Sequence, residues 1–151
     1  MIEYKDIFIF NFMTSAILYF DGCCKGNPGP SGSGALIKYE NIIWRDFEYV
    51  GNTTNNVAEY KGLILGLKQL KFLNINKVIV KGDSMLVINQ MNGKYKVNAP
   101  HLIPLYNEAK ELIKDIDVTF MYIPRTQNKE ADYLSNQGVK EHCVKPIFEF
   151  Y

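Results

Sequence analysis

This sequence of 151 residues lacks long apolar runs and has almost no net charge. No stretch reaches the ~20 apolar residues that a membrane-spanning helix requires. The N-terminus is not typical of a signal peptide, because its first charges are mostly acidic and its apolar part is short. The formal net charge is +1, which excludes a strongly basic protein, so a site for a polyanion must be a local patch. We therefore expect a protein with no membrane partner.

Cysteine is also scarce, since the sequence contains only Cys23, Cys24 and Cys143. Adjacent cysteines do not easily bridge each other, and no group of cysteine and histidine residues has the spacing of a zinc site. We interpret all three as free thiols. The sequence therefore predicts an intracellular protein in a reducing compartment, the cytoplasm.

Motifs for several other chemistries are missing. The glycines between residues 26 and 34 precede a predicted strand, so they do not form a dinucleotide-binding turn, and no G-K-S/T sequence completes a phosphate loop. Ser84, His101 and His142 do not suggest a nucleophile triad. We interpret both histidines as ordinary surface or helix residues.

The composition is that of a globular protein, with 47% hydrophobic and 22% charged residues. A chain of this length can bury a real core as one domain. Short apolar runs bounded by turn residues predict strands at residues 16–21, 32–39, 42–50, 77–81 and 118–123. The helical spacing of apolar residues predicts helices at residues 54–73, 84–91, 101–114 and 128–138.

This order of elements predicts an α/β fold with a mixed sheet. The first three strands are joined by short turns and are expected to be antiparallel, whereas the later strands follow helical crossovers and are expected to be parallel. The domain is predicted to span residues 15–138. Residues 1–14 are an N-terminal extension and residues 139–151 a C-terminal tail, and neither has a function that we can predict.

An acidic residue ends the first predicted strand. Residues 16–20 are apolar or aromatic, and Asp21 follows them directly before a turn rich in glycine and proline. Aspartate before glycine is most often a turn residue, so Asp21 alone indicates little. A carboxylate at the end of a buried strand, however, needs a partner such as a cation or an arginine, because burying it unpaired is costly.

Three further acidic residues occupy comparable junctions. Glu59 lies in the first two turns of the predicted helix 54–73, on the side of its apolar residues. Asp83 follows the buried strand 77–81, and Asp132 lies one turn into the helix 128–138, for which Asn128 is the predicted N-cap. Each acid alone has a simpler explanation, namely a favourable charge near a helix N-terminus or an N-cap.

Together the four acids predict a metal site. Ligand sites of open α/β sheets form at the carboxyl ends of strands, and four carboxylates gathered there cannot all ionise without compensation. Mg²⁺ takes oxygen ligands from a few carboxylates and keeps waters for a substrate phosphate. Two such ions ~3.5–4 Å apart can activate water and stabilise the leaving oxygen of a phosphodiester. Mn²⁺ is the alternative ion.

Four ordered segments carry these acids, and they resemble the type 1 ribonuclease H family across about residues 15–138. The segments are D-G-C-C-K-G-N-P-G-P-S-G, T-N-N-V-A-E-Y, G-D-S-M-L-V-I-N-Q and I-P-R-T-Q-N-K-E-A-D-Y-L-S-N. The resemblance implies a five-stranded mixed sheet in the order 3-2-1-4-5, flanked by helices. It implies hydrolysis of the RNA strand of RNA–DNA hybrids, which leaves 5′-phosphate and 3′-hydroxyl ends. It also implies that Asp21, Glu59, Asp83 and Asp132 bind metal.

The same resemblance implies which residues contact the hybrid. Asn27, Asn55 and Asn56, with backbone groups such as that of Cys24, are expected along the minor groove, and Thr54 at a DNA phosphate. The wide minor groove of A-like duplexes presents the 2′-hydroxyls that distinguish RNA from DNA, and uncharged donors and acceptors suit that task. Turn and cap roles are the simpler explanation for these asparagines.

The sequence departs from the family pattern in three places. Many members carry a histidine in the loop before the last acid that helps the product leave. Here this loop resembles that of archaeal and plant-type members, and Arg125 is our candidate for the role of the histidine. A surface phosphate contact or a salt bridge is the simpler role for Arg125. The basic helix and loop of some bacterial members is missing, with only Lys94 and Lys96 left, so hybrid affinity should be modest and sensitive to salt. Asn52 stands where some members have an arginine.

Two alternatives to an active ribonuclease H remain open. The first is a hybrid- or RNA-binding module of the same fold with little or no turnover. The second is a DNA nuclease on the same fold, such as a resolvase-like enzyme. The four acids argue against the first and the T-N-N-V-A-E segment against the second. We expect an enzyme that acts as a monomer.

Overall fold

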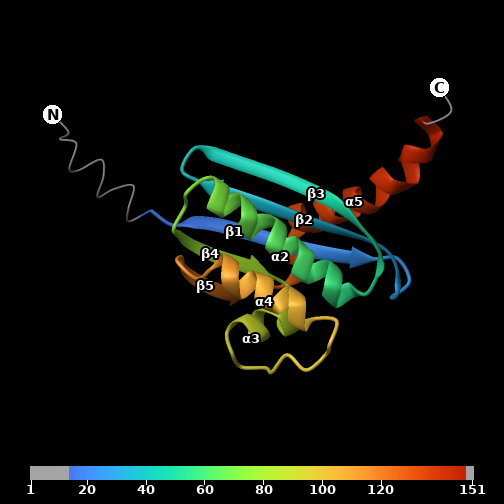
Figure 1. Ribbon diagram of the computed structural model, residues 1–151. Helices are drawn as coiled ribbons and strands as arrows, with labels where there is room; N and C mark the ends of the chain where they lie inside the picture. The colour runs from blue at the N-terminus through green and yellow to red at the C-terminus, as the bar shows by residue number, and fades with distance from the viewer. Residues whose placement is uncertain (1–13, 149–151) are drawn as a thin grey trace.

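The computed structural model describes residues 14–148, so the predicted N-terminal extension lies outside the described residues except for Thr14. Five strands form one sheet in the order β3-β2-β1-β4-β5, which confirms the expected order (Figure 1). They are β1 (Ala16–Cys24), β2 (Gly29–Tyr39), β3 (Ile42–Thr53), β4 (Lys77–Gly82) and β5 (Asp117–Tyr122). The strands β1, β2 and β3 pair antiparallel, and β4 and β5 are added in parallel, as predicted.

Helices cover both faces of this sheet. The elements are α2 (Asn55–Phe72), α3 (Met85–Met91), α4 (Ile103–Leu112), the short 3₁₀ helix η1 (Arg125–Gln127) and α5 (Lys129–Phe148). Helices α2 and α4 lie on one face and α5 crosses the other (Figure 1).

The prediction that the last helix ends at residue 138 was wrong. The segment after Gly138 contains no glycine or proline before Pro146, so nothing in it stops the helix.

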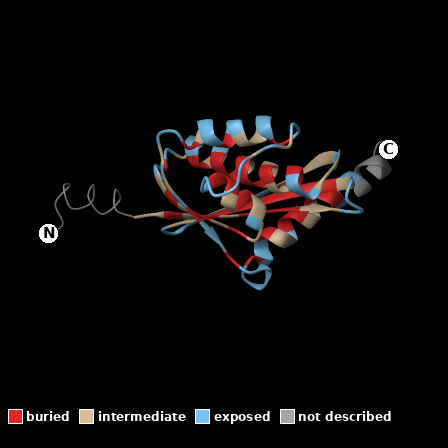
Figure 2. Ribbon diagram, turned by 90° about the horizontal axis from the view of Figure 1, so that it is seen from below, coloured by how far each residue is buried: buried red, intermediate tan, exposed pale blue. Residues whose placement is uncertain are grey.

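The core lies between the sheet and α2. Alternate residues of β1, namely Ala16, Leu18 and Phe20, are fully buried, because successive side chains of a strand point to opposite faces. They pack against the apolar side of α2, which includes Leu63 and Leu67. Figure 2 shows the buried residues, in red, gathered where the helices meet the sheet. The start of α2 is fixed by Thr54, whose Oγ1 accepts a hydrogen bond from the Val57 N–H.

Three strand boundaries differ from the sequence prediction by three residues, one of them the end of β3, which lies at Thr53 rather than at residue 50. Strand β1 does not end at Asp21 but continues to Cys24, and β2 begins at Gly29 rather than at residue 32. The segment rich in glycine and proline pairs as a ladder, in which Asp21 lies opposite Gly34 and Cys24 opposite Ser31. The turn itself is short, and the Lys25 N–H donates to the Pro30 carbonyl across it. Asp21 is therefore a residue within a strand.

Glycines let the helices approach the sheet closely where these acids lie. A Cβ on Gly34 would come within 2.6 Å of the Ser135 nitrogen, so α5 can lie against β2 only because that Cβ is missing. Gly22 plays the same part for α2, since a Cβ there would lie 2.3 Å from the Glu59 nitrogen. Both helices that carry acidic residues thus pack almost directly on the backbone of the sheet.

Two further observations concern the sequence predictions. Cys23 and Cys24 are free thiols, and the side chain of Cys143 lies outside what the structure describes. Among residues 14–148, no helix has both the length and the apolar character needed to cross a bilayer.

Candidate active site

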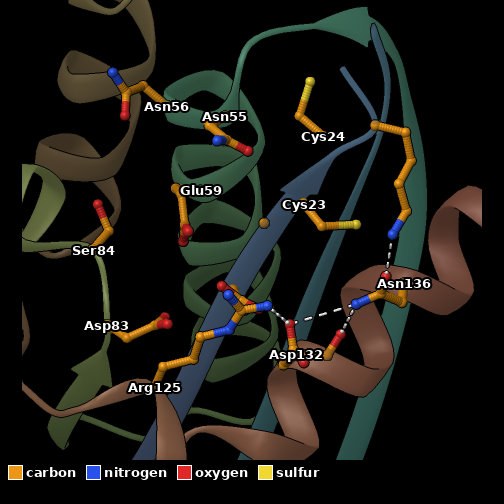
Figure 3. Close-up of a pocket in the computed structure, with 13 residues that line it drawn as sticks. Cys23, Cys24, Asn55, Asn56, Glu59, Asp83, Ser84, Arg125, Asp132 and Asn136 are labelled. Carbon is orange, nitrogen blue, oxygen red and sulfur yellow. Dashed lines mark hydrogen bonds and ion pairs between the residues drawn. The ribbon is translucent and has the colours of Figure 1, made fainter. Parts of the chain in front are cut away.

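An open cavity of about 410 Å³ lies where β1 and β4 end and where α2 and α5 begin. All four predicted acids line it (Figure 3). The remaining lining residues are Gly22, Cys23, Cys24, Lys25, Asn55, Asn56, Ser84, Arg125 and Asn136. Segments that are far apart in the sequence therefore supply one polar site.

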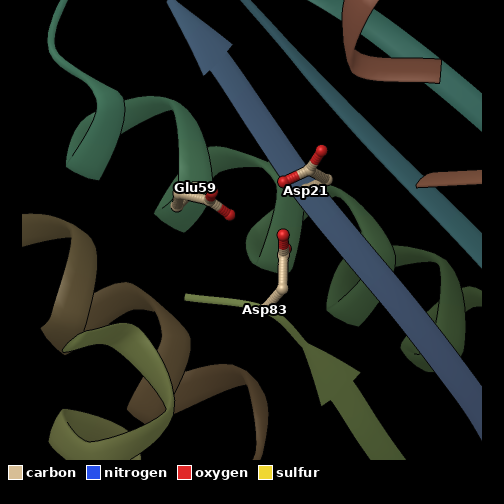
Figure 4. A group of neighbouring side chains, drawn as sticks. All are labelled: Asp21, Glu59 and Asp83. Carbon is tan, nitrogen blue, oxygen red and sulfur yellow. The ribbon is translucent and has the colours of Figure 1, made fainter. Parts of the chain in front are cut away.

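Asp21, Glu59 and Asp83 form the centre of this cavity. Each offers a carboxylate oxygen, and the three oxygens lie within 4.8 Å of one another. Figure 4 shows the three side chains converging from β1, from α2 and from the end of β4. A group of this kind can place three hard oxygen ligands around one small cation.

The simpler roles of Glu59 and Asp83 do not describe their surroundings. Helix α3 is capped by Ser84, whose Oγ accepts from the Val87 N–H at 3.2 Å, so Asp83 is not its N-cap. Glu59 lies beyond the first turn of α2. Its side chain is half-buried and its Oε2 is inaccessible to water and without a hydrogen bond. A carboxylate held like this is not a solvated helix-terminal charge.

Two of the three carboxylates, those of Asp21 and Glu59, bind protons more tightly than usual. Burial, followed by the charge of Asp83, raises the pKa of Asp21 from its ordinary 3.8 to about 8. Burial and then the neighbouring Asp21 raise the pKa of Glu59 well above its usual range, which the nearby backbone of Gly22 only partly opposes. With a pKa of about 8, Asp21 holds a proton at neutral pH in the absence of a cation.

These observations fit a divalent cation. The ligands are oxygens, as Mg²⁺ and Mn²⁺ prefer. The buried Oε2 of Glu59 has no hydrogen-bond donor in the protein, and an acceptor left in this way is costly unless a ligand satisfies it. The raised pKa values of Asp21 and Glu59 come first from burial and then from neighbouring carboxylate charge, and a bound cation would offset both effects.

Asp132 lines the same cavity but does not belong to this compact group of three. It lies in the first turn of α5, as predicted. Its Oδ1 lies 3.7 Å from Nη2 of Arg125, and its side chain is 34% exposed. The structure therefore brings all four acids to one site, in which Asp132 lies beside the exposed Arg125 (Figure 3).

The predicted substrate contacts divide into two groups. Asn55, Asn56 and Cys24 line the cavity. Thr54 and Asn27 do not, and their side chains stabilise the start of α2: Thr54 caps it, and Oδ1 of Asn27 accepts from the Asn55 N–H at 3.0 Å. The Cys24 thiol donates to the Thr53 carbonyl at 3.1 Å.

The residues at which the sequence departs from the family pattern lie elsewhere. Lys94, Lys96 and Asn52 are exposed and do not line the cavity. Both histidines are exposed, as we expected; His142 stacks on Tyr49 with ring centroids 3.9 Å apart. Arg125 is the departure that does reach the site, and its side chain is 79% exposed.

The sequence analysis missed several polar residues that hold the acids. Asn136 donates to the backbone oxygen of Asp132 at 2.8 Å and accepts from Nζ of Lys25 at 2.8 Å. It follows Asp132 by one helical turn, a spacing that predicts contact. Oγ of Ser135 lies 2.8 Å from the Asp132 carbonyl and 3.3 Å from Oδ2 of Asp21, and its one proton is shared between these two acceptors. No local signal connects Ser135 with β1, because the contact depends on how α5 packs.

Asn128 occupies the N-cap position of α5, as predicted, and its carbonyl accepts from the Asp132 N–H, but its side chain does not cap the helix. Oδ1 of Asn128 has no hydrogen-bond partner. Its Nδ2 instead donates to the Phe20 carbonyl at 2.9 Å and to Oδ1 of Asp83 at 3.0 Å.

Comparisons with known proteins agree with this geometry. Residues 19–138 match the family described as "Reverse transcriptase-like". The bifunctional protein Rv2228c of Mycobacterium tuberculosis is 37% identical over 127 residues, which cover 82% of this chain and 35% of that protein. The chain thus spans about a third of the length of this mycobacterial relative. The solved N-terminal RNase H domain of the same protein aligns with a TM-score of 0.83 and 34% identity, covering 88% of this chain and 99% of that one.

Two further proteins match over nearly their whole length. The ribonuclease H of Caldicellulosiruptor saccharolyticus is 34% identical over 147 residues, which cover 85% of this chain and 99% of that protein. The structure of LC11 RNase H1 in complex with an RNA/DNA hybrid aligns with a TM-score of 0.80 and 35% identity, over 85% of this chain and 99% of that one. The chain therefore belongs to the ribonuclease H family.

Proposed function

We propose that this protein is an endonuclease that hydrolyses the RNA strand of RNA–DNA hybrids, with divalent metal ions, and leaves 5′-phosphate and 3′-hydroxyl ends. The observation that carries this proposal is the convergence of Asp21, Glu59 and Asp83 within 4.8 Å, with Asp132 in the same cavity. Membership of the ribonuclease H family and the likeness to LC11 RNase H1 in its hybrid complex support it.

The four acids would hold the metal, Mg²⁺ or in its place Mn²⁺. Two bound ions would activate a water and stabilise the leaving 3′-oxygen of the scissile phosphodiester. Asp21 and Glu59 lie deepest, so they hold negative charge at a place that water screens poorly. Asp132 and the exposed Arg125 stand at the open side, where a phosphate can approach and a product can leave.

We assign recognition of the hybrid to uncharged side chains that lie beside the acids in the cavity. Asn55 and Asn56 present amides at the start of α2 on the wall of the cavity. Such groups can sense bases and 2′-hydroxyls in a wide minor groove. Asn27 and Thr54 act mainly by holding this helix start in place, with Thr54 also available to a DNA phosphate. The exposed pair Lys94 and Lys96 adds little positive charge, so affinity should be modest and salt-sensitive.

A direct test uses labelled RNA–DNA hybrid, duplex DNA and duplex RNA, each with Mg²⁺, with Mn²⁺ or with EDTA. Cleavage of the hybrid RNA alone, only with metal, supports the proposal, and end-group analysis of the fragments checks the 5′-phosphate. Binding of the hybrid without cleavage would instead favour a binding module. Cleavage of duplex DNA would favour a DNA nuclease.

A further inference from the structure

We propose that Asn128 is a positioning residue, whose side-chain amide bridges β1 and Asp83 and so fixes the separation of the Asp21 and Asp83 carboxylates for metal binding. The inference rests on the proposed function in taking these acids as metal ligands. It adds a residue outside the acidic set that determines how tightly the set binds.

The bridge is short and buried. Nδ2 of Asn128 donates to the Phe20 carbonyl at 2.9 Å and to Oδ1 of Asp83 at 3.0 Å. The residue is only 2% exposed, so water does not compete for these bonds. Both hydrogens of one NH₂ group are used, one on the residue directly before Asp21 and one on the carboxylate of Asp83.

The bridge lies where the pairing of β1 with β4 ends, so it can set the distance between Asp21 and Asp83. The parallel pairing of β1 with β4 ends at the pair Phe20 and Gly82. An acid of the site follows directly in each segment: Asp21 follows Phe20 within β1, and Asp83 follows Gly82 after the end of β4. Beyond that pair no ladder bond joins the two strands, and the two acids repel each other once both are ionised. The amide of Asn128 closes the gap at this point.

The unused end of the amide points to the same role. An asparagine that serves as an N-cap accepts a hydrogen bond from the first turn of its helix through Oδ1. Here Oδ1 of Asn128 is buried and accepts none, and an unsatisfied buried acceptor is destabilising. The conformation of Asn128 therefore favours its donors over its acceptor, at the expense of capping α5.

The test compares Asn128→Ser with Asn92→Ser in the full chain. Serine is a preferred N-cap, so the first variant can still start α5, but its short hydroxyl cannot span to both acceptors. Asn92 is the matched control, since its Nδ2 also donates to a strand carbonyl, that of Phe120 at 3.3 Å, but contacts no acid. Asn128→Ala is a second variant that removes both donor and cap.

The first readout is Mn²⁺ affinity by calorimetry on the protein without hybrid. Loss of a group that holds a ligand typically weakens metal binding 10–100-fold, so we expect the Kd of Asn128→Ser to rise about tenfold or more, and that of Asn92→Ser to stay unchanged. Wild-type Mn²⁺ affinity in Asn128→Ser and Asn128→Ala would overturn the inference. So would a wild-type protein that binds no Mn²⁺.

The second readout is the Mg²⁺ dependence of cleavage. We expect Asn128→Ser to need about tenfold more Mg²⁺ for half-maximal rate, with kcat recovering at high Mg²⁺ and KM for the hybrid unchanged. A lowered kcat with unchanged Mg²⁺ dependence would show a merely structural role. If the wild type cleaves no hybrid but Asn128→Ser still weakens Mn²⁺ binding, the proposed function fails and the inference stands.

Discussion

Glu59 lies beside Asp21 because only the α-hydrogens of Gly22 separate β1 from the start of α2. A Cβ on Gly22 would lie 2.3 Å from the Ala58 carbonyl carbon and 2.3 Å from the Glu59 nitrogen, both backbone atoms. Gly62 lies one turn further along α2, and a Cβ added there would lie 2.4 Å from the carbonyl oxygen of Asp21. The packing of one helix on one strand therefore sets the distance between two of the acids.

Gly22→Ala should damage both stability and metal binding. The backbone atoms it meets cannot rotate away as a flexible side chain could, so α2 must shift away from β1. Overpacking of this kind costs about 1–3 kcal/mol, and the shift carries Glu59 away from Asp21. We expect a lower Tm by calorimetry and a higher Mg²⁺ concentration for half-maximal cleavage.

Gly51→Ala is the control for this prediction. Gly51 has a positive φ of 85°, and a Cβ added there would meet no atom within 4 Å, so alanine is strained at this position but clashes with nothing. Its Tm should fall by a comparable or smaller amount, while the Mg²⁺ dependence should not change. If both variants shift Mg²⁺ dependence equally, the effect comes from stability alone.

Asp83→Asn should abolish cleavage and leave the fold intact. The substitution keeps the size of a half-buried side chain and an oxygen that can accept from Asn128, but removes one of the three converging charges. The loss of rate should exceed the ~100-fold that follows loss of an outer-shell partner, and the Tm of the metal-free protein should not fall. The exposed Asp115→Asn removes the same charge elsewhere and should cleave normally. A near wild-type rate in Asp83→Asn would remove Asp83 from the site.

Mg²⁺ binding should release protons, and the stability it adds should grow with pH. The pKa of Asp21 rises from 3.8 to about 8 on folding. The metal-free folded state then binds more protons than the unfolded chain, so this group makes stability fall as pH rises from about 4 to 8. A bound cation requires the ionised form and displaces the proton, so it removes this loss.

Calorimetric titration with Mg²⁺ at pH 7, in buffers of different ionisation heat, measures the protons released. We expect at least one proton per protein molecule, because Asp21 and Glu59 both bind protons more tightly than usual in the metal-free protein. The rise in Tm caused by Mg²⁺ should be small at about pH 5 and larger at about pH 8. An equal rise at both pH values would mean that Asp21 is already ionised in the metal-free protein.

The resemblance to the ribonuclease H family implied the sheet order, which the structure confirms. The four acids that line the cavity were already marked by ordered local motifs. The sequence was insufficient at the boundary of β1, where glycine and proline suggested a long turn although Gly22 and Gly29 belong to strands. Glycine and proline indicate that a segment can form a turn. The pairing of β1 with β2 determines where the turn lies. The end of α5 was missed because the domain motif ends before the helix does.

The supporting residues were harder to predict than the acids. Asn128 follows the local rule for an N-cap, yet its amide is used by β1 and Asp83, which lie far away in the sequence. Ser135 contacts Asp21 only because α5 lies against Gly34. Such contacts depend on tertiary packing, which overrides local preference and leaves no periodic signal in a single sequence.

Arg125→Ala should slow the release of product rather than the cleavage step. The guanidinium lies 3.7 Å from Asp132 at the open side of the cavity and is 79% exposed. An exposed ion pair contributes only about 0–1 kcal/mol to stability, so the Tm should not change. We expect a several-fold lower kcat in steady state, an unchanged rate in single-turnover cleavage and a burst of product in the first turnover. Arg125→Lys keeps the charge and should retain most of the rate. A higher KM with unchanged kcat would instead assign Arg125 to phosphate binding alone, because it would mean that substrate and transition state are held equally by the side chain.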